Sequence, residues 1–544
     1  MNNEKNQFNT ETNAGSAKVM KKHKFVILGG GPGGLQLAYD LQQQNADYLV
    51  IEGADAPGNS FKLFPRHRKL ISINKVFTGS KDPEFNMRHD WNSLLCDDDD
   101  FRFKNYDKDF FPHADSLLAY LADFVERFDI NIQYNTRAGL IDKKADGYII
   151  TDQNGNEIHC EVLIVATGLD RANIPQVEGI EYTEDYADMS LDLADYEDKR
   201  VLIIGKKNSA FETADHLIPA AAMIHLVSPN SINMAWKTHY VGDLRAVNNN
   251  FLDTYQLKSQ NAILDADISS IKKQGEQLLV TFKYHHAENE VESILYDKVI
   301  TCTGFKFDAS IFADSLELKL AYKGKYPALK NNFESVNNDN LFFAGTLTHS
   351  LDYKKSTSGF IHGFRYNSKV LAKILTEKYL GKAQAQETLN TEAQCIADHM
   401  LKRINRSGGL WQQPGFIADA AILDNGCFRY IKESQKDYLV ERYGQTEKSL
   451  FVLTLEYGAP IVGDPFAVER IHRENIDAAA SSQFLHPVVR HYRNGEMLAK
   501  HDVIEDLEAQ WVEPEHYEPL IEFFNQQYAQ KHNTDNELAA PLEV

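Results

Sequence analysis

One short stretch near the start of the chain, KFVILGGGPGGLQLAYDLQQQ, restricts the fold more than any other part of the sequence. An apolar run leads into a glycine-rich turn, a helical pattern follows, and a second apolar run, DYLVIEG, comes after it. Gly29, Gly31 and Gly34 occupy the three glycine positions of a dinucleotide-binding turn, with Pro32 and Gly33 between them. The first glycine permits a tight turn, the second lets the backbone approach a pyrophosphate, and the third lets the helix pack on the strand. The stretch therefore predicts the strand, turn and helix that open a parallel sheet.

Two further features assign this turn to FAD. Glu52 ends the second predicted strand, 23 residues after Gly29, where an acid can accept hydrogen bonds from ribose hydroxyls. The apolar runs VLIVATG and VITCTG end at Gly168 and Gly304, and the run LFFAGT contains Gly345. Strands that end in small residues are typical of the crossings between domains in flavoproteins with two dinucleotide folds. An ordinary buried strand would look the same, but together with Gly29 and Glu52 these runs indicate FAD.

A second strand, turn and helix begin at VLIIGKKNSAFETAD, residues 201–215. Gly205 starts this turn and Asn208 and Ser209 open the helix, but Lys207 stands where the second glycine of the motif belongs. A side chain there hinders close backbone approach, whereas its ammonium adds about 1 kcal/mol of attraction to a pyrophosphate when solvated. Because the two effects are similar in size, the turn predicts either a nicotinamide dinucleotide held with the help of Lys207 or a turn that holds none.

The residues after the next predicted strand, IHLVSPN, bear on which nicotinamide would bind. No acid stands there to hold a 2′-hydroxyl, which disfavours NADH, and Pro229 and Asn230 replace the arginine that commonly grips a 2′-phosphate. Lys206, Lys237 and Arg245 could take its place. We expect FAD as the first cofactor and NADPH as the second.

These motifs predict an α/β protein with two nested Rossmann-like dinucleotide-binding folds and a C-terminal α/β domain. The predicted parts are a disordered tail at 1–22, an outer FAD-binding domain at 23–195 and 297–383, an inner NAD(P)H-binding-like domain at 196–296, and a C-terminal domain at 395–530. The stretch GKAQAQETLNTEAQ, residues 381–394, is expected to be a helical or mobile linker. A chain of 544 residues exceeds a single core, which agrees with several domains.

Composition excludes several classes of partner. A formal net charge of −21 repels phosphates at long range, so we expect no nucleic acid and no anionic membrane as partner. No apolar run is long enough for a signal peptide or a membrane span, which predicts a cytoplasmic protein. The five cysteines are never spaced as CxxC, so neither a disulfide framework nor a redox-active pair is predicted. The acidic run at 97–100 is expected to be a solvated loop, and no metal site is predicted.

Four longer stretches are similar to those of known flavoproteins: PRHRKLISINK (65–75), EFNMRHDWNSLL (84–95), THYVGDLRAVNNNFLDTYQLKS (238–259) and SLDYKKSTSGFIHGFRY (350–366). With the two glycine turns, they make the chain resemble the flavin-containing monooxygenase and pyridine nucleotide-disulfide oxidoreductase superfamily. More closely, it resembles the FAD-dependent oxidoreductase domain-containing protein 2 family, whose flavoprotein is associated with degradation at the endoplasmic reticulum. That role is not carried over, because the sequence shows no signal peptide and ends LAAPLEV, without a retention tail.

The resemblance implies roles for several residues. In flavin-dependent monooxygenases an asparagine lies over the flavin ring, and KLISINK puts Asn74 at that position, although an asparagine there could also cap a turn. Gly359 and Gly363 flank a predicted helix start that in the superfamily points backbone N–H groups at the flavin pyrimidine. Three neighbours in sequence are candidate acids or bases, or else structural hydrogen-bonding groups: His349, Asp352 and His362.

Basic residues gather in the stretch PRHRK. Arg66, His67, Arg68 and Lys69 are expected to pair with cofactor phosphates or an acidic substrate through charge-assisted bonds, with solvated surface charge as the alternative. One departure from the family pattern counts against oxygen insertion. Monooxygenases of the superfamily usually carry FxGxxxHxxxW before the second fold, and VEGIEYTEDYADMSLDLADY contains no histidine.

We therefore expect a FAD-dependent oxidoreductase in which NAD(P)H drives monooxygenase-like oxidation of a small organic substrate. One alternative is a flavin oxidase or dehydrogenase that takes hydride from its substrate and uses no nicotinamide. Another is a flavin-stabilised interaction protein. The C-terminal region, with FVLTLEYGAPIVGDPF and SSQFLHPVVRHY, is a candidate lid, homodimer surface or carrier-protein docking site.

Overall fold

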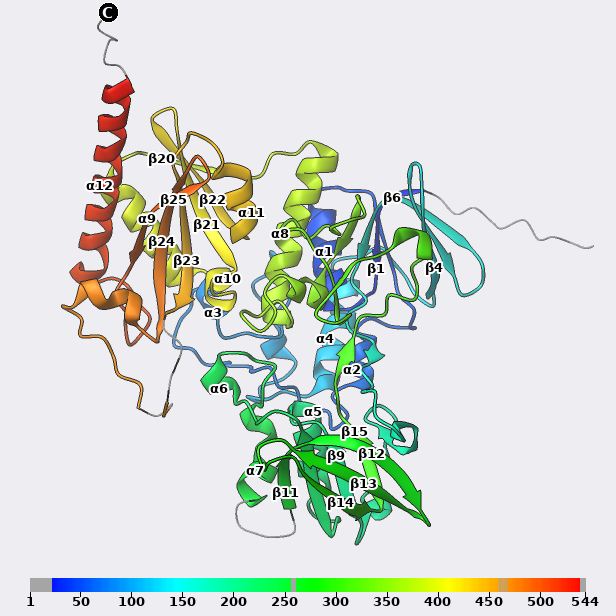
Figure 1. The fold of residues 1–544 in the computed structure, drawn as a ribbon. Coiled ribbons are helices and arrows are strands. Elements are labelled where there is room, and N and C mark those ends of the chain that lie inside the picture. The colour runs from blue at the N-terminus through cyan, green and yellow to red at the C-terminus, as the bar shows by residue number, and fades with distance from the viewer. Residues whose placement is uncertain (1–21, 256–260, 459–460, 462, 465–466, 539–544) are drawn as a thin grey trace, which may run out of the picture.

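The computed structural model describes residues 22–255, 261–458, 461, 463–464 and 467–538, so all but the last residue of the predicted tail at 1–22 lies outside the described residues. Three domains are visible in Figure 1: an outer domain on the right, an inner domain at the bottom and a C-terminal domain on the left. Helix α8 (Ile361–Leu380) lies between the outer sheet and the C-terminal sheet. The arrangement confirms the predicted α/β class with nested parallel sheets.

The outer domain is built on a seven-stranded sheet. The last four residues of β1 and all of β2 are buried, as expected for parallel strands covered on both faces. Strand β6 pairs in parallel with β1 and β19 through its second half and antiparallel with β5 through its first half. The strands of this sheet are β1 (His23–Leu28), β2 (Tyr48–Ile51), β3 (Ile132–Gln133), β4 (Ala138–Lys144), β5 (Gly147–Asp152), β6 (Glu157–Val165) and β19 (Leu341–Phe343).

The inner domain interrupts the outer one between β6 and β19. Its parallel sheet has the order β11-β10-β9-β15-β8, and a three-stranded antiparallel sheet follows β11 along the chain. Helix α5 (Asn208–Leu217) comes directly after β9, as the second glycine turn predicts. The strands are β8 (Glu184–Asp185), β9 (Arg200–Ile204), β10 (Met223–Ser228), β11 (Asn261–Asp265), β12 (Asp267–Gln274), β13 (Gln277–Tyr284), β14 (Glu290–Tyr296) and β15 (Lys298–Thr301).

The C-terminal domain is a six-stranded antiparallel sheet with the order β20-β22-β21-β23-β24-β25. Alternate residues of such strands face opposite sides, and helices cover the apolar side. The elements are β20 (Glu387–Leu389), α9 (Ala393–Arg406), α10 (Gly408–Gln412), β21 (Ile417–Asp424), β22 (Cys427–Gln435), α11 (Lys436–Tyr443), β23 (Leu450–Tyr457), β24 (Leu485–Arg493), β25 (Glu496–Asp502) and α12 (Pro514–Leu538).

Helices and short strands complete the outer and inner domains. Helix α1 packs against α8 on one face of the outer sheet. These remaining elements are α1 (Pro32–Gln43), α2 (Asn59–Leu63), α3 (Pro83–Asn86), α4 (Ala114–Arg127), β7 (Arg171–Ala172), α6 (Ala235–Thr238), α7 (Asn250–Tyr255), β16 (Phe305–Lys306), β17 (Leu320–Ala321) and β18 (Tyr326–Pro327).

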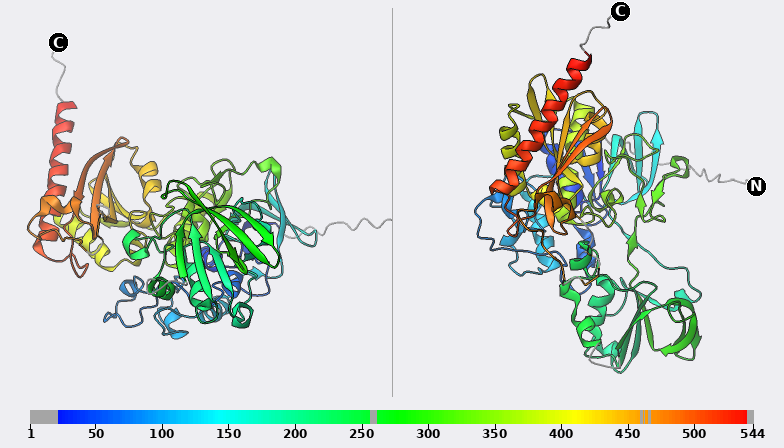
Figure 2. Two further views of the ribbon diagram at one scale, coloured as in Figure 1. Left: turned by 60° about the horizontal axis from the view of Figure 1, so that its bottom comes forward. Right: turned by 60° about the vertical axis from the view of Figure 1, so that its left-hand side comes forward.

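The outer and C-terminal domains share one apolar core. Leu371 and Leu375 of α8, Ile396 and Met400 of α9, and Phe451 of β23 belong to the same buried cluster. The inner domain instead has two clusters of its own, one on each face of its parallel sheet. It is set apart from the other two domains in the right view of Figure 2, and the antiparallel pair β7 and β16 lies where the chain crosses to it and back.

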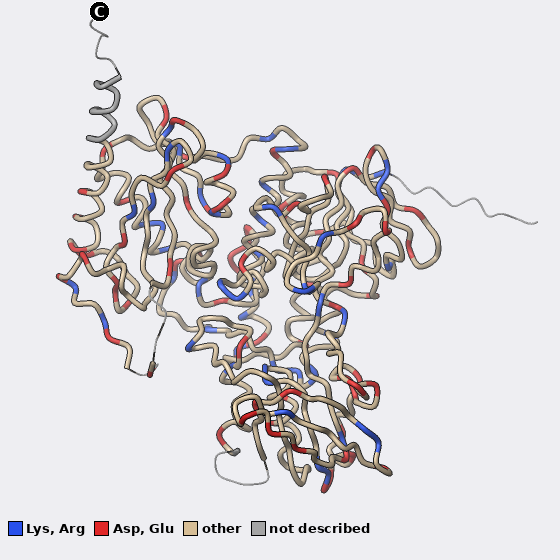
Figure 3. The backbone as a smooth tube through the Cα atoms, viewed as in Figure 1, with Lys and Arg blue, Asp and Glu red and all other residues tan. Residues whose placement is uncertain are grey.

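Charged residues are distributed over all three domains. Asp and Glu outnumber Lys and Arg by 78 to 57, and Figure 3 shows basic residues among the acidic ones in every domain. The acidic balance of the whole chain therefore does not come from one domain alone. None of the helices in the described part of the chain combines the length and apolar character needed to cross a bilayer.

Four boundaries differ from the sequence prediction. Strand β15 pairs with β9 and strand β8 pairs with β15, so the inner sheet reaches beyond 196–296 at both ends. The sequence prediction places the run VITCTG in the outer domain because it ends in small residues. A small-residue end does not reveal which sheet a strand joins. The stretch 381–394 is not a continuous helix, because it contains β20, which pairs with β22. The C-terminal domain thus begins before 395, and α12 carries it past 530.

Candidate active site

A cavity of about 410 Å³ lies where the outer and inner domains meet. Its lining is largely apolar and includes Phe64, Leu70, Phe305, Phe360 and Phe364. We refer to it as the central cavity. Nine residues singled out in the sequence line it, and they come from the two glycine turns and from the segments after β6 and β19: Gly31, Pro32, Gly33, Gly168, Asn208, Ser209, Gly345, Gly359 and His362.

Glycine is required at several positions of the first turn. Gly29 has a φ of +112°, and a Cβ there would lie 2.7 Å from the backbone oxygen just after β6. A Cβ on Gly33 would lie 2.4 Å from the Gly345 Cα, and one on Gly34 would lie 2.0 Å from the Gly29 oxygen. At Gly31 a Cβ would meet nothing within 4 Å, so this position borders open space at the N-terminus of α1. A tight turn, close helix packing and free space before a helix N-terminus are what a bound pyrophosphate requires.

Glu52 is fixed beside this turn by two backbone amides. Gly30 N–H donates to its Oε2 at 2.6 Å and Ala54 N–H donates to its Oε1 at 2.8 Å. These bonds hold the carboxylate at the end of β2, where a ribose would lie. A contact with ribose stays a prediction, since Glu52 is outside the lining of the central cavity.

The second turn keeps its tight geometry despite Lys207. Gly205 has a φ of +139°, and a Cβ there would lie 2.4 Å from the Cys302 carbonyl oxygen. Helix α5 starts directly after the turn, and Asn208, Ser209 and Glu212 line the central cavity. The N-terminus of the inner-domain helix therefore opens on the same space as the outer-domain turn.

A loop of the inner domain covers the start of α5. The Lys207 Nζ lies 2.9 Å from the Asp243 Oδ1, so its charge is already paired. The Asn208 Nδ2 donates to the Asp243 carbonyl at 2.8 Å, and its Oδ1 accepts from the Arg245 N–H at 3.0 Å. The predicted phosphate partners of the second turn are thus bonded to the loop that follows α6.

His362 is the most isolated polar side chain of the central cavity. It is 1% exposed, and neither ring nitrogen has a hydrogen-bond partner. Its ring stacks on Trp91 with centroids 4.1 Å apart, and the inner-domain Arg245 lies over the Trp91 ring. Burial, with the charges of Arg365 and Arg245, holds the pKa of His362 well below its usual range. A neutral imidazole with two free nitrogens on a cavity wall can donate one hydrogen bond and accept another.

The pattern that defines the pyridine nucleotide-disulphide oxidoreductase family matches residues 26–345, more than half of the chain. The chain belongs to this family. The glycine cradle and the unpartnered His362 fit a flavin in the central cavity. The protein is therefore a FAD-dependent oxidoreductase.

A relative within the family covers almost the whole chain. FAD-dependent oxidoreductase domain-containing protein 2 from Mus musculus is 37% identical, over 92% of this chain and 83% of the relative. An alignment of that extent includes most of the C-terminal domain. The resemblance found in the sequence is confirmed.

Solved structures match the fold at lower identity. A flavin-containing monooxygenase from Stenotrophomonas maltophilia has a TM-score of 0.52 at 18% identity, over 66% of this chain and 99% of its own. A bacillithiol disulfide reductase from Staphylococcus aureus has a TM-score of 0.51 at 20% identity, over 66% of this chain and all of its own. These matches support the paired dinucleotide folds of the family and leave part of the chain without a counterpart.

Asn74 is bonded to protein carbonyls in this structure, and its place over the flavin ring stays a prediction. The Asn74 Nδ2 donates to the Asp107 carbonyl at 2.8 Å, and its N–H donates to the Phe110 carbonyl at 2.9 Å. Asn74 is 3% exposed and outside the lining of the central cavity. These contacts correspond to the turn-holding alternative that the sequence leaves open.

The basic cluster of PRHRK contacts protein groups. The Arg66 Nη2 donates to a backbone carbonyl after β8 at 2.8 Å, and the His67 ring lies against the His216 ring of α5. Arg68 pairs with Asp115 of α4 at 2.6 Å. Burial lowers the pKa of His67 to about 4. None of the three basic residues lines the central cavity, and Arg66 and His67 join the outer domain to the inner one.

His349 and Asp352 form a buried dyad behind the cavity wall. The His349 Nδ1 lies 2.8 Å from the Asp352 Oδ1, and the two side chains are 1% and 3% exposed. The His349 ring stacks with Tyr240 of the inner domain at 5.6 Å. A Cβ on Gly359, which lines the cavity, would lie 3.1 Å from the His349 ring. The dyad is therefore separated from the central cavity by the backbone at Gly359, so it would support the wall of the site and does not line it.

Two more predicted glycines border the central cavity without lining it. Gly304 has a φ of +80° just after β15. A Cβ on Gly363 would lie 2.1 Å from the Thr357 carbonyl oxygen, so this glycine lets the start of α8 pack on the preceding loop. Their roles are conformational.

Glu212 is a site residue that the sequence reasoning missed. It lines both the central cavity and a neighbouring cavity of about 640 Å³, and the Tyr186 hydroxyl donates to its Oε1. Burial raises the pKa of Glu212 to about 7, so the carboxyl can exchange a proton near neutral pH. The available signal is its spacing, since Glu212 stands one helical turn after Asn208 and on the same face of α5.

The C-terminal domain contributes a buried glutamine to the wall of the site. The Gln413 Nε2 donates to the Asn367 Oδ1 at 2.7 Å, and its Oε1 accepts from the hydroxyls of Ser356, Thr357 and Ser358. The loop 356–358, which carries these hydroxyls, leads directly into Gly359. The third domain thus supports the segment that forms one side of the central cavity.

Proposed function

We propose that the protein uses NAD(P)H to reduce its flavin and oxidises a small organic substrate in the central cavity. The observation that carries the proposal is that residues of both dinucleotide folds line one space, Gly31 and Gly33 from the first and Asn208, Ser209 and Glu212 from the second. Hydride transfer needs donor and acceptor atoms roughly 3 Å apart. A nicotinamide held at α5 would enter the same cavity as the flavin.

The chain supplies binding, orientation and proton handling. When bound, FAD would supply the redox chemistry, taking electrons from NAD(P)H and giving them to oxygen, which is the oxidant for the substrate. The apolar lining excludes water around the reacting atoms. His362 offers a neutral hydrogen-bond donor and acceptor, and Glu212 holds a proton that it can release near pH 7. In this proposal His362 orients the substrate and Glu212 moves the proton.

A lysine cluster supports NADPH as the reductant. Lys325 and Lys354 of the outer domain lie 5.6 and 5.5 Å from the Tyr353 ring, near Lys207 at the start of α5. Burial and the charges of Lys207 and Lys354 lower the pKa of Lys325 to about 8. No residue in the described part of the chain forms an ion pair with Lys325. A phosphate group bound here would relieve the repulsion among the three ammonium groups.

Monooxygenase-like oxidation is favoured over disulfide exchange for this cavity. All five cysteines lie among the described residues and are unpaired, and none of them lines the central cavity. A dithiol or disulfide substrate would find no partner thiol at the flavin. The fold that this chain shares with the flavin-containing monooxygenase from Stenotrophomonas maltophilia is compatible with such oxidation.

The covering loop favours a second candidate, a flavin oxidase or dehydrogenase that uses no nicotinamide. The amide of Asn208 is already bonded to the loop, and Asp243 places a carboxylate next to Lys207. A nicotinamide dinucleotide would have to displace this loop. The two candidates differ in whether the loop opens.

Anaerobic stopped-flow reduction separates the two candidates. Under the main proposal, NADPH bleaches the flavin far faster than it bleaches free FAD, and Asp243→Asn lowers the NADPH concentration needed, because it weakens the bond between Lys207 and the loop. Readmission of oxygen then gives oxidised substrate rather than peroxide alone. If neither NADPH nor NADH reduces the flavin in the wild type or in Asp243→Asn, the nicotinamide-independent candidate replaces the main one.

A further inference from the structure

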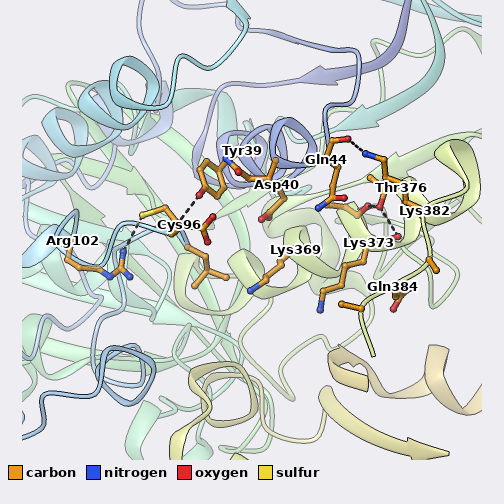
Figure 4. A pocket seen from close by; sticks show the side chains of 16 residues that line it. Tyr39, Asp40, Gln44, Cys96, Arg102, Lys369, Lys373, Thr376, Lys382 and Gln384 are labelled. Carbon is orange, nitrogen blue, oxygen red and sulfur yellow. Dashed lines mark hydrogen bonds between the residues drawn. The ribbon is translucent and has the colours of Figure 1, made fainter. Parts of the chain in front are cut away.

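A cavity of about 450 Å³ lies between α1 and α8, next to the segment that leads into the C-terminal domain (Figure 4). It shares no lining residue with the central cavity. Its volume is in the range of small-molecule sites, roughly 300–1,000 Å³. We refer to it as the α1–α8 cavity. Neither the family match nor the flavin accounts for it.

Helix α8 provides a basic wall. Lys369 and Lys373 are one helical turn apart and both line the α1–α8 cavity. The Lys373 Nζ donates to the carbonyls of Lys432 and Glu433 at 3.1 and 3.3 Å. The Lys369 side chain, by contrast, has neither a hydrogen bond nor an ion pair within 4 Å with any described residue, and the charge of the largely buried Glu433, whose pKa both lysines help to lower, compensates it in part. Two like charges at this spacing disfavour the helix by about 0.2–0.5 kcal/mol, so an anion between them would be stabilising.

Helix α1 provides an acidic wall. Asp40 lines the cavity opposite the lysines, and its Oδ2 accepts one bond from the Gln36 Nε2 at 3.1 Å. It forms no ion pair within 4 Å with Lys369 or Lys373, although both are close enough to influence it. Burial raises the pKa of Asp40 to about 7, and the two lysines counter this only in part. Gln44, on the same wall, adds an amide.

The two walls keep opposite charges apart across an open space. If Asp40 and Lys369 were each other's only charge partners, their side chains would be expected to form an ion pair, because a partly buried charge is costly without a partner. A molecule that carries one charge of each sign would pair with the charged side chains of both walls at once. We propose that the α1–α8 cavity binds a small zwitterion, with its carboxylate or phosphate on Lys369 and Lys373 and its ammonium on Asp40.

Calorimetric titration of the full-length holoprotein at pH 8, where Asp40 is largely ionised, tests the proposal. The probes are 2-aminoethyl phosphate and β-alanine, which distinguish a phosphate from a carboxylate. Inorganic phosphate, acetate and ethylamine each carry only one of the two charges. We expect at least one zwitterion to bind about tenfold more tightly than any single-charge probe, a difference of about 1.4 kcal/mol. The absorbance of the flavin should not change, because the central cavity is separate.

Three variants make the test specific. Lys369→Met and Asp40→Asn should each weaken zwitterion binding about tenfold. Lys104→Met removes the same charge from an exposed site outside the cavity and should leave the affinity unchanged. Flavin occupancy and melting temperature verify that each variant is folded, and Lys369→Gln replaces Lys369→Met if that variant is not.

Each other outcome overturns the proposal. If no zwitterion binds the wild type at concentrations up to about 10 mM, the cavity is not such a site. If inorganic phosphate binds as tightly as 2-aminoethyl phosphate, the cavity is an anion site and Asp40 takes no part. Unchanged affinity in Lys369→Met would place the bound probe elsewhere.

Discussion

Replacing Gln413 with alanine tests whether the C-terminal domain shapes the flavin site. Gln413 is fully buried between α10 and β21, and its amide bonds to Asn367 of α8 and to the loop that leads into Gly359. The same loop presents the Ser358 N–H to Asp352 at 3.1 Å, so it also anchors the dyad. The change removes a hydrogen-bonding group that connects two domains at the wall of the central cavity.

The expected cost follows from the bonds that are lost. Each buried neutral hydrogen bond contributes about 1 kcal/mol net, and a buried group left without its partner costs about 1–3 kcal/mol. The serine and threonine hydroxyls can turn to other acceptors, whereas the Asn367 Oδ1 loses the donor that Gln413 supplies. With the cavity left by the side chain, we expect Gln413→Ala to lower the free energy of unfolding by about 3 kcal/mol. For a folding unit of this size that is a fall in melting temperature of roughly 3–6 °C.

The assay combines thermal unfolding with visible circular dichroism of the bound flavin, which reports the surroundings of the ring. Gln435→Ala is the matched control, because Gln435 is also a buried glutamine of the C-terminal domain but caps α11 away from the central cavity. We expect both variants to lose stability and only Gln413→Ala to alter the flavin signal. A Gln413→Ala protein with wild-type stability would refute the energy argument. Loss of stability with an unchanged flavin spectrum would refute the link to the site.

Three further results are expected. Gly31→Ala should fold and bind less FAD, because its Cβ would occupy the open space before α1, whereas Gly34→Ala should be insoluble, because its Cβ would lie 2.0 Å from a backbone oxygen. Flavin absorbance per mole of soluble protein checks both results. Lys325→Met should weaken NADPH binding, and wild-type affinity should fall as the pH rises through about 8, where Lys325 loses its proton; equal affinities at pH 7 and 9 would contradict this. His362→Leu should keep FAD and lower turnover about 100-fold by removing both ring nitrogens, and a pre-steady-state trace with unchanged rates would rule out the role of His362.

The sequence predicts the two glycine turns correctly because their constraints are local. Gly29 and Gly205 adopt φ values of +112° and +139°, a conformation that belongs to the turn itself and that the motif records. Partners from distant segments leave no such trace. Asn74 and Arg66 have residue types suited to a flavin site, yet their bonds go to carbonyls that only the folded chain brings near.

Pairing between distant strands explains the remaining differences. The run VITCTG fits either parallel sheet by its apolar pattern, and only its register with β9 shows that it belongs to the inner one. The antiparallel order of the C-terminal domain depends on contacts between strands far apart in the chain, which local patterns do not encode. Glu212 carries a readable signal in its helical spacing, but its burial depends on Tyr186, from another segment.

The apolar cluster shared by the outer and C-terminal domains determines how far each domain depends on the others. The inner domain has apolar clusters of its own and connects where β7 and β16 pair, but Phe64 of the outer domain packs against one of them and Tyr240 stacks on His349, so an exchanged nucleotide fold would have to rebuild these contacts. The C-terminal domain has one cluster of its own, which includes Ile422 and Val452, but it shares its larger core with the outer domain. A chain ending after α8 would expose Leu371 and Leu375 in a cluster that α9 and β23 help to complete. A chain that ends after α8 is therefore expected to be less stable than the full chain, because the shared core would lose the side chains that the C-terminal domain supplies.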